Sequence, residues 1–175
     1  MKHPVTGKQH NSRMCFICGL ENRFGLKASF YSVDRQGKPE LVGLFTAAEE
    51  HQGYPGRLHG GISAAILDET IGRAILLADS GDAWGVTVDF SVKYRKAIPT
   101  GVELRAVGRL SLINKRFFEG SGEILLPDGT VAAEGRGKYI RMRLDQIVDS
   151  DFKAQEWRKV DSPGDPAAIE LPADG

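Results

Sequence analysis

One segment constrains the fold more than any other, because only one stretch has the length and composition of a buried helix. Residues 62–78 are rich in alanine, isoleucine and leucine. Their small and apolar side chains recur at helical spacing along one stripe, which contains Ala64, Leu67, Ile71 and Ala74 and ends at Ala78. A helix that is apolar over much of its circumference has to be covered by other elements. The segment therefore predicts one long central helix.

Candidate strands lie on both sides of this helix in the sequence. Two precede it, at residues 26–34 and 40–46, and the Gln-Gly-Lys-Pro turn between them predicts an antiparallel pair. Four strands, expected as a meander, follow at residues 86–95, 102–113, 117–126 and 131–143. The first alternates strictly between apolar and polar residues, which is typical of a strand with one buried face. The short connections exclude parallel crossovers, so we expect an α+β fold in which an antiparallel sheet wraps one helix.

The length of 175 residues favours one domain. We expect residues 26–143 to form that domain and residues 1–25 to form a polar lead-in, mostly loop, with a turn near Cys18. Residues 144–175 are expected to be a C-terminal extension with at most a short helix near residues 151–158. From residue 161 onward the composition predicts a mobile tail.

Composition excludes several classes of function. The chain has 23 basic and 23 acidic residues, and this balance argues against a nucleic-acid partner. No apolar run is long enough for a membrane helix, and the polar N-terminus lacks the apolar core of a secretory signal. Two cysteines are too few for a disulfide framework, so we expect a cytoplasmic protein without a membrane partner.

The two cysteines form a Cys-x-x-Cys pair, Cys15 and Cys18, that invites a zinc interpretation. A structural zinc site needs four ligands, and neither a second cysteine pair nor a histidine at a recognised spacing is present. A redox dithiol is also disfavoured, because no βαβ pattern surrounds the pair. We therefore expect no metal and no cofactor.

The predicted helix begins at His59-Gly60-Gly61, and this start is a candidate site. Glycines there allow another group to approach the backbone, and the first N–H groups of a helix are free at the positive end of its dipole. Such groups can hydrogen-bond a carbonyl oxygen that gains negative charge during acyl transfer. The alternative is a glycine-rich loop that serves only its turn.

Asp68 is the strongest catalytic candidate. No basic residue stands three or four positions away from it, so no local ion pair accounts for a carboxylate on a small, apolar helix face. Its neighbour Glu69 has Arg73 four residues on, which predicts a surface ion pair. A buried structural aspartate, bonded to a neighbouring strand, remains the alternative for Asp68.

The pattern made by Gly56, His59, Gly60, Gly61 and Asp68 resembles the hotdog-fold acyl-CoA thioesterases of the phenylacetate-pathway type. Residues 15–26 and 85–96 also resemble segments of that superfamily. The resemblance implies a homodimer or homotetramer with active sites at the dimer interface, and hydrolysis of acyl-CoA.

The same resemblance assigns roles to four residues. It implies that Asp68 is the general base or the nucleophile and that the Gly60 N–H polarises the thioester carbonyl. It implies that Thr87 positions the attacking water and that His59 organises the loop. Some relatives carry asparagine or glutamine before the histidine, where this chain has Gln52-Gly53, so the register of Gln52 stays open.

Two basic clusters at strand ends are candidates for binding the phosphates of coenzyme A. They are Tyr94-Arg95-Lys96 and Lys115-Arg116, and the alternative for each is an ordinary solvated strand end. The serine-hydrolase elbow and the zinc-protease and P-loop motifs are absent from the sequence. Acyl-CoA hydrolysis is therefore the predicted function, with a hotdog acyl-thioester dehydratase and a non-catalytic acyl-CoA-binding module as alternatives.

Overall fold

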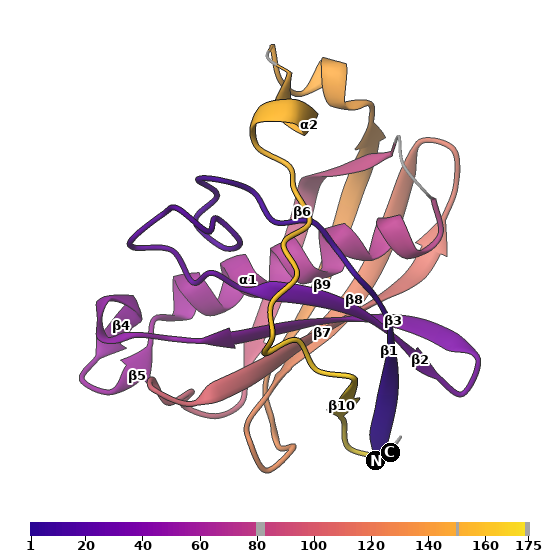
Figure 1. Ribbon diagram of the computed structural model, residues 1–175. Coiled ribbons are helices and arrows are strands. Elements are labelled where there is room, and N and C mark those ends of the chain that lie inside the picture. Colours follow the sequence, from indigo (N-terminus) through magenta and orange to yellow (C-terminus); the bar gives the residue numbers. More distant parts are fainter. Residues whose placement is uncertain (80–82, 150, 174–175) are drawn as a thin grey trace.

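The computed structural model describes residues 1–79, 83–149 and 151–173, and its main feature is one antiparallel sheet curved around helix α1 (Gly60–Arg73) (Figure 1). In spatial order the strands are β10 (Ala168–Glu170), β1 (Lys2–Lys8), β2 (Ser29–Arg35), β3 (Lys38–Thr46), β7 (Glu103–Ile113), β8 (Phe117–Leu125), β9 (Val131–Met142) and β6 (Trp84–Tyr94). Strands β4 (Gln52–Tyr54) and β5 (Arg57–Leu58) pair separately, just before the helix. The predicted α+β arrangement is confirmed.

Helix α1 lies unusually close to the sheet, because glycines stand beneath it. A β-carbon on Gly108 of β7 would come within 2.7 Å of the Thr70 carbonyl oxygen, and one on Gly120 of β8 would meet the Ile71 side chain at 2.7 Å. Leu67 and Ile71 on the facing side of the helix are fully buried. The predicted helix was slightly long, since α1 ends at Arg73 and continues as a 3₁₀ turn, η2 (Ala74–Leu77). The predicted helix is followed by residues 79–82. Asp79 is described by the structure, and residues 80–82 lie outside the described residues.

The order of the strands corrects one prediction. Strands β7, β8 and β9 form a meander, but β6 pairs with β9 and not with β7, so the expected four-stranded meander is wrong. Strands that follow one another in the chain are only usually neighbours in a sheet. Here the segment 95–102 leads from β6, at the edge of the sheet, past β9 and β8 to the central strand β7. The antiparallel character of the whole sheet is confirmed.

Both ends of the chain are part of the sheet, which corrects two further predictions. The lead-in was expected as loop, yet residues 2–8 form strand β1, which pairs with β2 and with β10. The segment from residue 161 was expected to be mobile, yet it supplies β10, and Ile169 and Leu171 are buried. The Met1 ammonium donates to the Leu171 carbonyl oxygen at 2.6 Å. At three residues β10 is too short to leave a pattern in the sequence, and β1 is largely polar and lacks an apolar alternation.

The C-terminal extension contains the 3₁₀ turn η3 (Leu144–Gln146) and the short helix α2 (Phe152–Gln155), as expected near residues 151–158. The 3₁₀ turn η1 (Glu49–His51) precedes β4. None of the helices in the described ranges is long and apolar enough to span a membrane.

Strand β6 forms one edge of the sheet. Its predicted alternation is interrupted by a bulge, because the pairing with β9 shifts between Thr87 and Asp89. Val88 is therefore 51% exposed and Tyr94 is 56% exposed. A long edge strand with exposed apolar side chains is a surface that natural proteins usually cover by pairing.

Candidate active site

His59 is the N-cap residue of α1. Its backbone is extended, and its Nδ1 accepts a hydrogen bond from the Gly61 N–H at 2.9 Å, so it caps the helix. Tyr94, at the far end of β6, donates its hydroxyl to the Gly60 carbonyl oxygen at 2.7 Å. Among the described residues no hydrogen bond engages the Gly60 N–H. This amide is thus a free donor at the positive end of the helix dipole.

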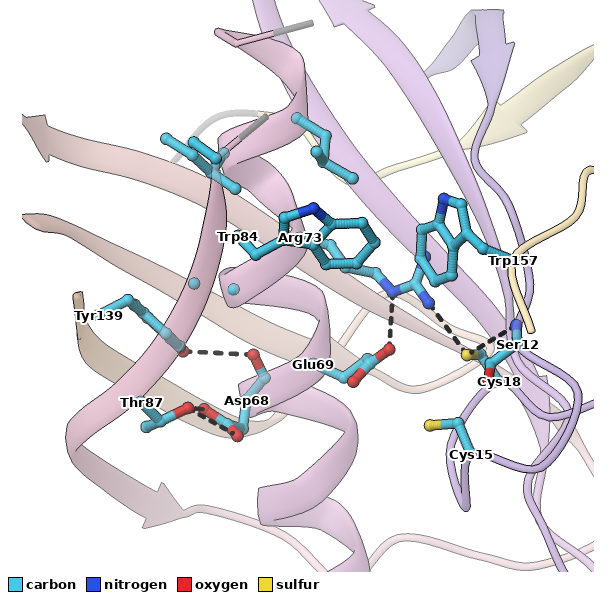
Figure 2. A pocket seen from close by; sticks show the side chains of 15 residues that line it. Ser12, Cys15, Cys18, Asp68, Glu69, Arg73, Trp84, Thr87, Tyr139 and Trp157 are labelled. Carbon is cyan, nitrogen blue, oxygen red and sulfur yellow. Dashed lines mark hydrogen bonds and ion pairs between the residues drawn. The ribbon is translucent and has the colours of Figure 1, made fainter. Parts of the chain in front are cut away.

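Asp68 lies two turns further along α1 and faces β6. The Thr87 hydroxyl donates to its carboxylate, 2.9 Å from Oδ1 and 3.2 Å from Oδ2 (Figure 2). Among the ion pairs of the described residues none involves Asp68, and the basic residue closest on its helix, Arg73, pairs with Glu69. The carboxylate is therefore held in place without being neutralised.

The surroundings of Asp68 weaken its acidity. Burial raises the pKa of the Asp68 carboxyl above the ordinary value, although the hydrogen bond from Thr87 works in the opposite direction. The Tyr139 hydroxyl donates to the Asp68 backbone oxygen at 3.2 Å, and burial raises the pKa of Tyr139, which keeps that hydroxyl protonated. A carboxylate with a raised pKa is a better proton acceptor than an ordinary aspartate.

A cavity of about 240 Å³ adjoins Asp68 and Thr87. Its walls include two tryptophans from distant parts of the chain, Trp84 at the start of β6 and Trp157 in the C-terminal extension (Figure 2). Their rings meet edge to face, with centroids 4.8 Å apart. The space beside the carboxylate is therefore a partly open pocket with mainly apolar walls, which suits a small organic group.

The opposite wall of the cavity carries a second polar cluster. The predicted ion pair between Glu69 and Arg73 is present, with Nε 2.7 Å from Oε1, but it is not at the surface, because the Arg73 side chain is only 7% exposed. Arg73 also donates to Cys18 Sγ at 2.9 Å, and its guanidinium stacks on Trp157 and Phe30. Cys15 lies beside Cys18, whose hydrogen bond lowers the pKa of Cys15 to about 7.

The structure does not bring all the predicted residues together within one chain. Asp68 and Thr87 are in contact, whereas Gly60 and His59 lie at the start of the helix. Gly60 and Asp68 are eight residues apart, or about 12 Å along a helix. One thioester carbonyl cannot touch both groups of a single chain. The side chain of Gln52 is engaged in its own loop, where it accepts from the Gly56 N–H at 3.0 Å.

The two basic clusters also lie far apart. Tyr94-Arg95-Lys96 follows the end of β6, beside Gly60, and Arg95 forms an ion pair with Glu134 at 2.9 Å. Lys115-Arg116 forms the tip between β7 and β8. The Arg116 carbonyl oxygen accepts from the Arg141 N–H, and Arg141 pairs with Gly85 of β6, so this tip lies beside the start of β6. The clusters thus lie at opposite ends of β6, which spans about 33 Å.

Several residues of the site were missed in the sequence. Tyr139 is an ordinary inward residue of β9, and its contact with Asp68 depends on β9 being the neighbour of β6. Trp157 stands in the extension and shows no periodic pattern. The closeness of Glu69 to the cysteines could have been suspected only by pairing two segments about 50 residues apart.

Comparisons with known proteins agree with this geometry. Residues 55–133 match the family model of the thioesterase superfamily. The thioesterase-superfamily protein RHA08564 is 27% identical with a TM-score of 0.63, and the match covers 73% of this chain and 60% of that one. This chain thus spans less than two thirds of the length of RHA08564.

Two further structures are similar. Another thioesterase-superfamily protein of known X-ray structure is 29% identical, with a TM-score of 0.59 and coverage of 69% of this chain and 89% of that one. The thioesterase HI1161 from Haemophilus influenzae shares the fold, at 15% identity and a TM-score of 0.62, over 73% of this chain and 86% of that one. A sequence search of curated proteins returns no significant match. The matching segment contains both the glycine start of α1 and Asp68, so over residues 55–133 the chain is similar to the thioesterase superfamily, and its fold is the hotdog fold.

Proposed function

We propose that this protein hydrolyses acyl-CoA thioesters, with Asp68 as the group that activates or attacks. The observation that carries the proposal is the state of the Asp68 carboxylate. It is half-buried, has a raised pKa, is held by Thr87 and lines a partly open cavity. The similarity of residues 55–133 to the thioesterase superfamily supports thioester hydrolysis in general. The phenylacetate-pathway branch and the acyl-CoA substrate remain part of the proposal.

The reaction follows from these positions. Asp68 removes a proton from a water molecule that the Thr87 hydroxyl helps to orient, and the hydroxide forms a bond to the thioester carbonyl carbon. The carbonyl oxygen gains negative charge, which the Gly60 N–H stabilises. Collapse of this intermediate breaks the carbon–sulfur bond, and the CoA thiolate takes up the proton. Direct attack by Asp68, followed by hydrolysis of the resulting anhydride, leads to the same products.

The distance between Gly60 and Asp68 requires a second copy of the chain. We propose that two β6 edges pair antiparallel around a two-fold axis near residues 90–91. Thr87 of one copy then lies opposite Tyr94 of the other, because both are about three to four residues from that axis. Tyr94 holds the start of its own α1. Each site thereby combines Asp68 and Thr87 of one copy with Gly60 and His59 of the other.

The same pairing brings the two basic clusters together. The end of β6 with Arg95 in one copy approaches the start of β6, and hence Arg116, in the other. The proposed CoA site is thus a rim of Tyr94, Arg95 and Lys96 from one copy and Lys115 and Arg116 from its partner copy. A homodimer is the minimum assembly for this site, and the homotetramer and the cytoplasmic location remain proposals.

Arg116→Ala or Arg95→Ala is expected to raise KM for acyl-CoA more than it lowers kcat. Phosphate contacts made equally in the ground and transition states are uniform binding. Steady-state kinetics with a matched acyl-pantetheine substrate, which lacks the nucleotide, should show a much smaller change. Lys38→Ala, at the exposed first residue of β3, is the control for loss of a surface charge. An equal loss on both substrates would move these arginines out of the nucleotide site.

The proposed function is tested by a panel of short, medium, long and aromatic acyl-CoAs, with the released thiol detected. Multiple turnovers of thiol release from at least one of them are expected. Tight binding without thiol release would favour the acyl-CoA-binding module. Addition of water across an enoyl-CoA with the thioester left intact would favour the hotdog hydratase or dehydratase.

A further inference from the structure

Three side chains beside the cavity form a cluster that the proposed hydrolysis does not use. Cys15 and Cys18 come from the turn that follows β1, and Glu69 comes from α1. Their two sulfur atoms and one carboxylate oxygen all lie within 4.8 Å of one another. Figure 2 shows Glu69 on the side of the helix that faces the cysteines, while Asp68 faces Thr87. Thiolate and carboxylate groups at such separations are the ligand types of protein zinc sites.

The sulfur atoms are surrounded by N–H donors. The Ile17 N–H donates to Cys15 Sγ at 3.3 Å, and the Ser12 N–H donates to Cys18 Sγ at 3.4 Å. The Arg73 guanidinium adds a third donor, 2.9 Å from Cys18 Sγ. A thiol sulfur is a weak acceptor, so three donors on two sulfur atoms favour thiolates, although the hydrogen bond with Cys15 and burial raise the pKa of Cys18 as long as no cation is bound.

The turn that carries the cysteines has a fixed shape. The Gly19 N–H closes it on the Cys15 carbonyl oxygen at 2.8 Å, and a β-carbon on Gly19 would lie 2.3 Å from that oxygen. Only glycine fits there, and the tight turn keeps both sulfur atoms on the side that faces α1. The geometry of two ligands is therefore set before any ion arrives.

The charges of the cluster call for a divalent cation once the thiols ionise. Two thiolates and the Glu69 carboxylate carry −3, and Arg73 contributes +1, which leaves −2. Arg73 also orients two of the three ligands, since it bonds Cys18 Sγ and, at 2.7 Å, Glu69 Oε1. Glu69 Oε2 is left for an ion. Outer contacts of this kind hold metal ligands in position in known sites.

We propose that Cys15, Cys18 and Glu69 bind one zinc ion. Thiolate ligands favour zinc among the common divalent ions, and zinc accepts a tetrahedron of two sulfur atoms, one carboxylate oxygen and one water. The fourth position opens toward the cavity that these residues line. The absence of a metal was expected because no other cysteine or histidine has a suitable spacing, but Glu69, 51 positions after Cys18, supplies the third ligand through the fold.

The test is metal content and cobalt spectroscopy of the full chain. Protein prepared with zinc and then desalted is expected to hold about one zinc per chain by elemental analysis. After removal of zinc by a chelator, added Co²⁺ should produce a thiolate-to-cobalt charge-transfer band and the visible bands of tetrahedral cobalt. Cys15→Ser should abolish the charge-transfer intensity of one thiolate. Glu69→Gln should keep the sulfur bands but weaken Co²⁺ binding about tenfold or more.

Two controls keep this result separate from the proposed hydrolysis. Asp68→Asn should bind Co²⁺ as the wild type does, and Glu134→Gln is the matched carboxylate control on an exposed strand position. A folded wild-type protein that contains no zinc and gives no cobalt thiolate band overturns the proposal. A bound ion protects its thiolates from oxidation. The proposal is therefore also contradicted if hydrogen peroxide forms the Cys15–Cys18 disulfide as fast in zinc-loaded protein as in zinc-free protein.

Discussion

Asp68→Asn is expected to lower kcat for acyl-CoA hydrolysis by about 10²–10⁴-fold, the usual loss for a positioned general base. Asparagine keeps the size of the side chain and can still accept from Thr87, but it has neither the basicity nor the nucleophilicity of a carboxylate. Binding of acyl-CoA should survive, because Asp68 makes no contact with the proposed nucleotide rim. Single-turnover kinetics together with equilibrium binding of a non-hydrolysable acyl-CoA analogue separate the two quantities.

Asp34→Asn, at an exposed position near the end of β2, is the control for loss of an aspartate elsewhere. A fully active Asp68→Asn protein would refute the assignment. The same variant should be more stable than the wild type at neutral pH. Burial raises the pKa of Asp68 in the folded state, so stability is lost as the pH rises through that pKa and the carboxylate ionises. The gain from asparagine should therefore disappear below the ordinary pKa of aspartate, as followed by urea unfolding at several pH values.

Gly60→Pro is expected to lower kcat by about 10²–10³-fold, because it removes the single N–H proposed to stabilise the oxyanion. Gly60 is the first residue of α1, where proline is well tolerated, and His59 before it is extended, with ψ of 136°. Gly60→Ala is the matched control. It retains the N–H, and its β-carbon would meet the Tyr94 ring at an ordinary distance of 3.5 Å. Comparable losses in both variants would show that bulk, and not the donor, is responsible.

Mixing the two inactive proteins tests whether the site is shared. In a mixed dimer of Asp68→Asn and Gly60→Pro, one of the two sites receives an intact aspartate from one copy and an intact glycine from the other. Unfolding and refolding an equal mixture makes half of the dimers mixed, so about one quarter of the wild-type activity should return. No recovery in a mixture shown to contain mixed dimers would place each site within a single chain.

The sequence was sufficient to predict features that depend on the spacing of apolar or charged residues within a short segment. The stripe through Leu67 and Ile71 identified α1, and turn residues separated β2 from β3 and β8 from β9. Asp68 was singled out because no neighbour on its own helix explained it, and the structure places it against Thr87, whose role in positioning water stays a prediction. These features depend on residues within a few turns or on motifs of fixed spacing.

The sequence was insufficient where a contact depends on the curvature of the sheet. The pairing of β6 with β9 decides that Tyr139 reaches Asp68, and nothing in either strand identifies the other as its partner. Arg73 was expected at the surface as half of an ion pair with Glu69. It is buried instead, because segments from both ends of the chain, carrying Cys18 and Trp157, cover it.

The way the two ends of the chain close one side of the sheet has a consequence for how copies can associate. Beyond β1 the sheet ends in β10, which is only three residues long. The Met1 ammonium is hydrogen-bonded to Leu171, the residue that follows β10. Such a short border gives an incoming strand little to pair with, whereas β6 offers eleven residues at the opposite border. A molecule with a single sheet edge long enough to pair can pair it only with the same edge of another copy. That two-fold contact leaves no further edge free. Under the proposed pairing of two β6 edges, edge-to-edge growth stops at two chains, and a tag fused before Met1 would lie at the border that takes no part in that pairing.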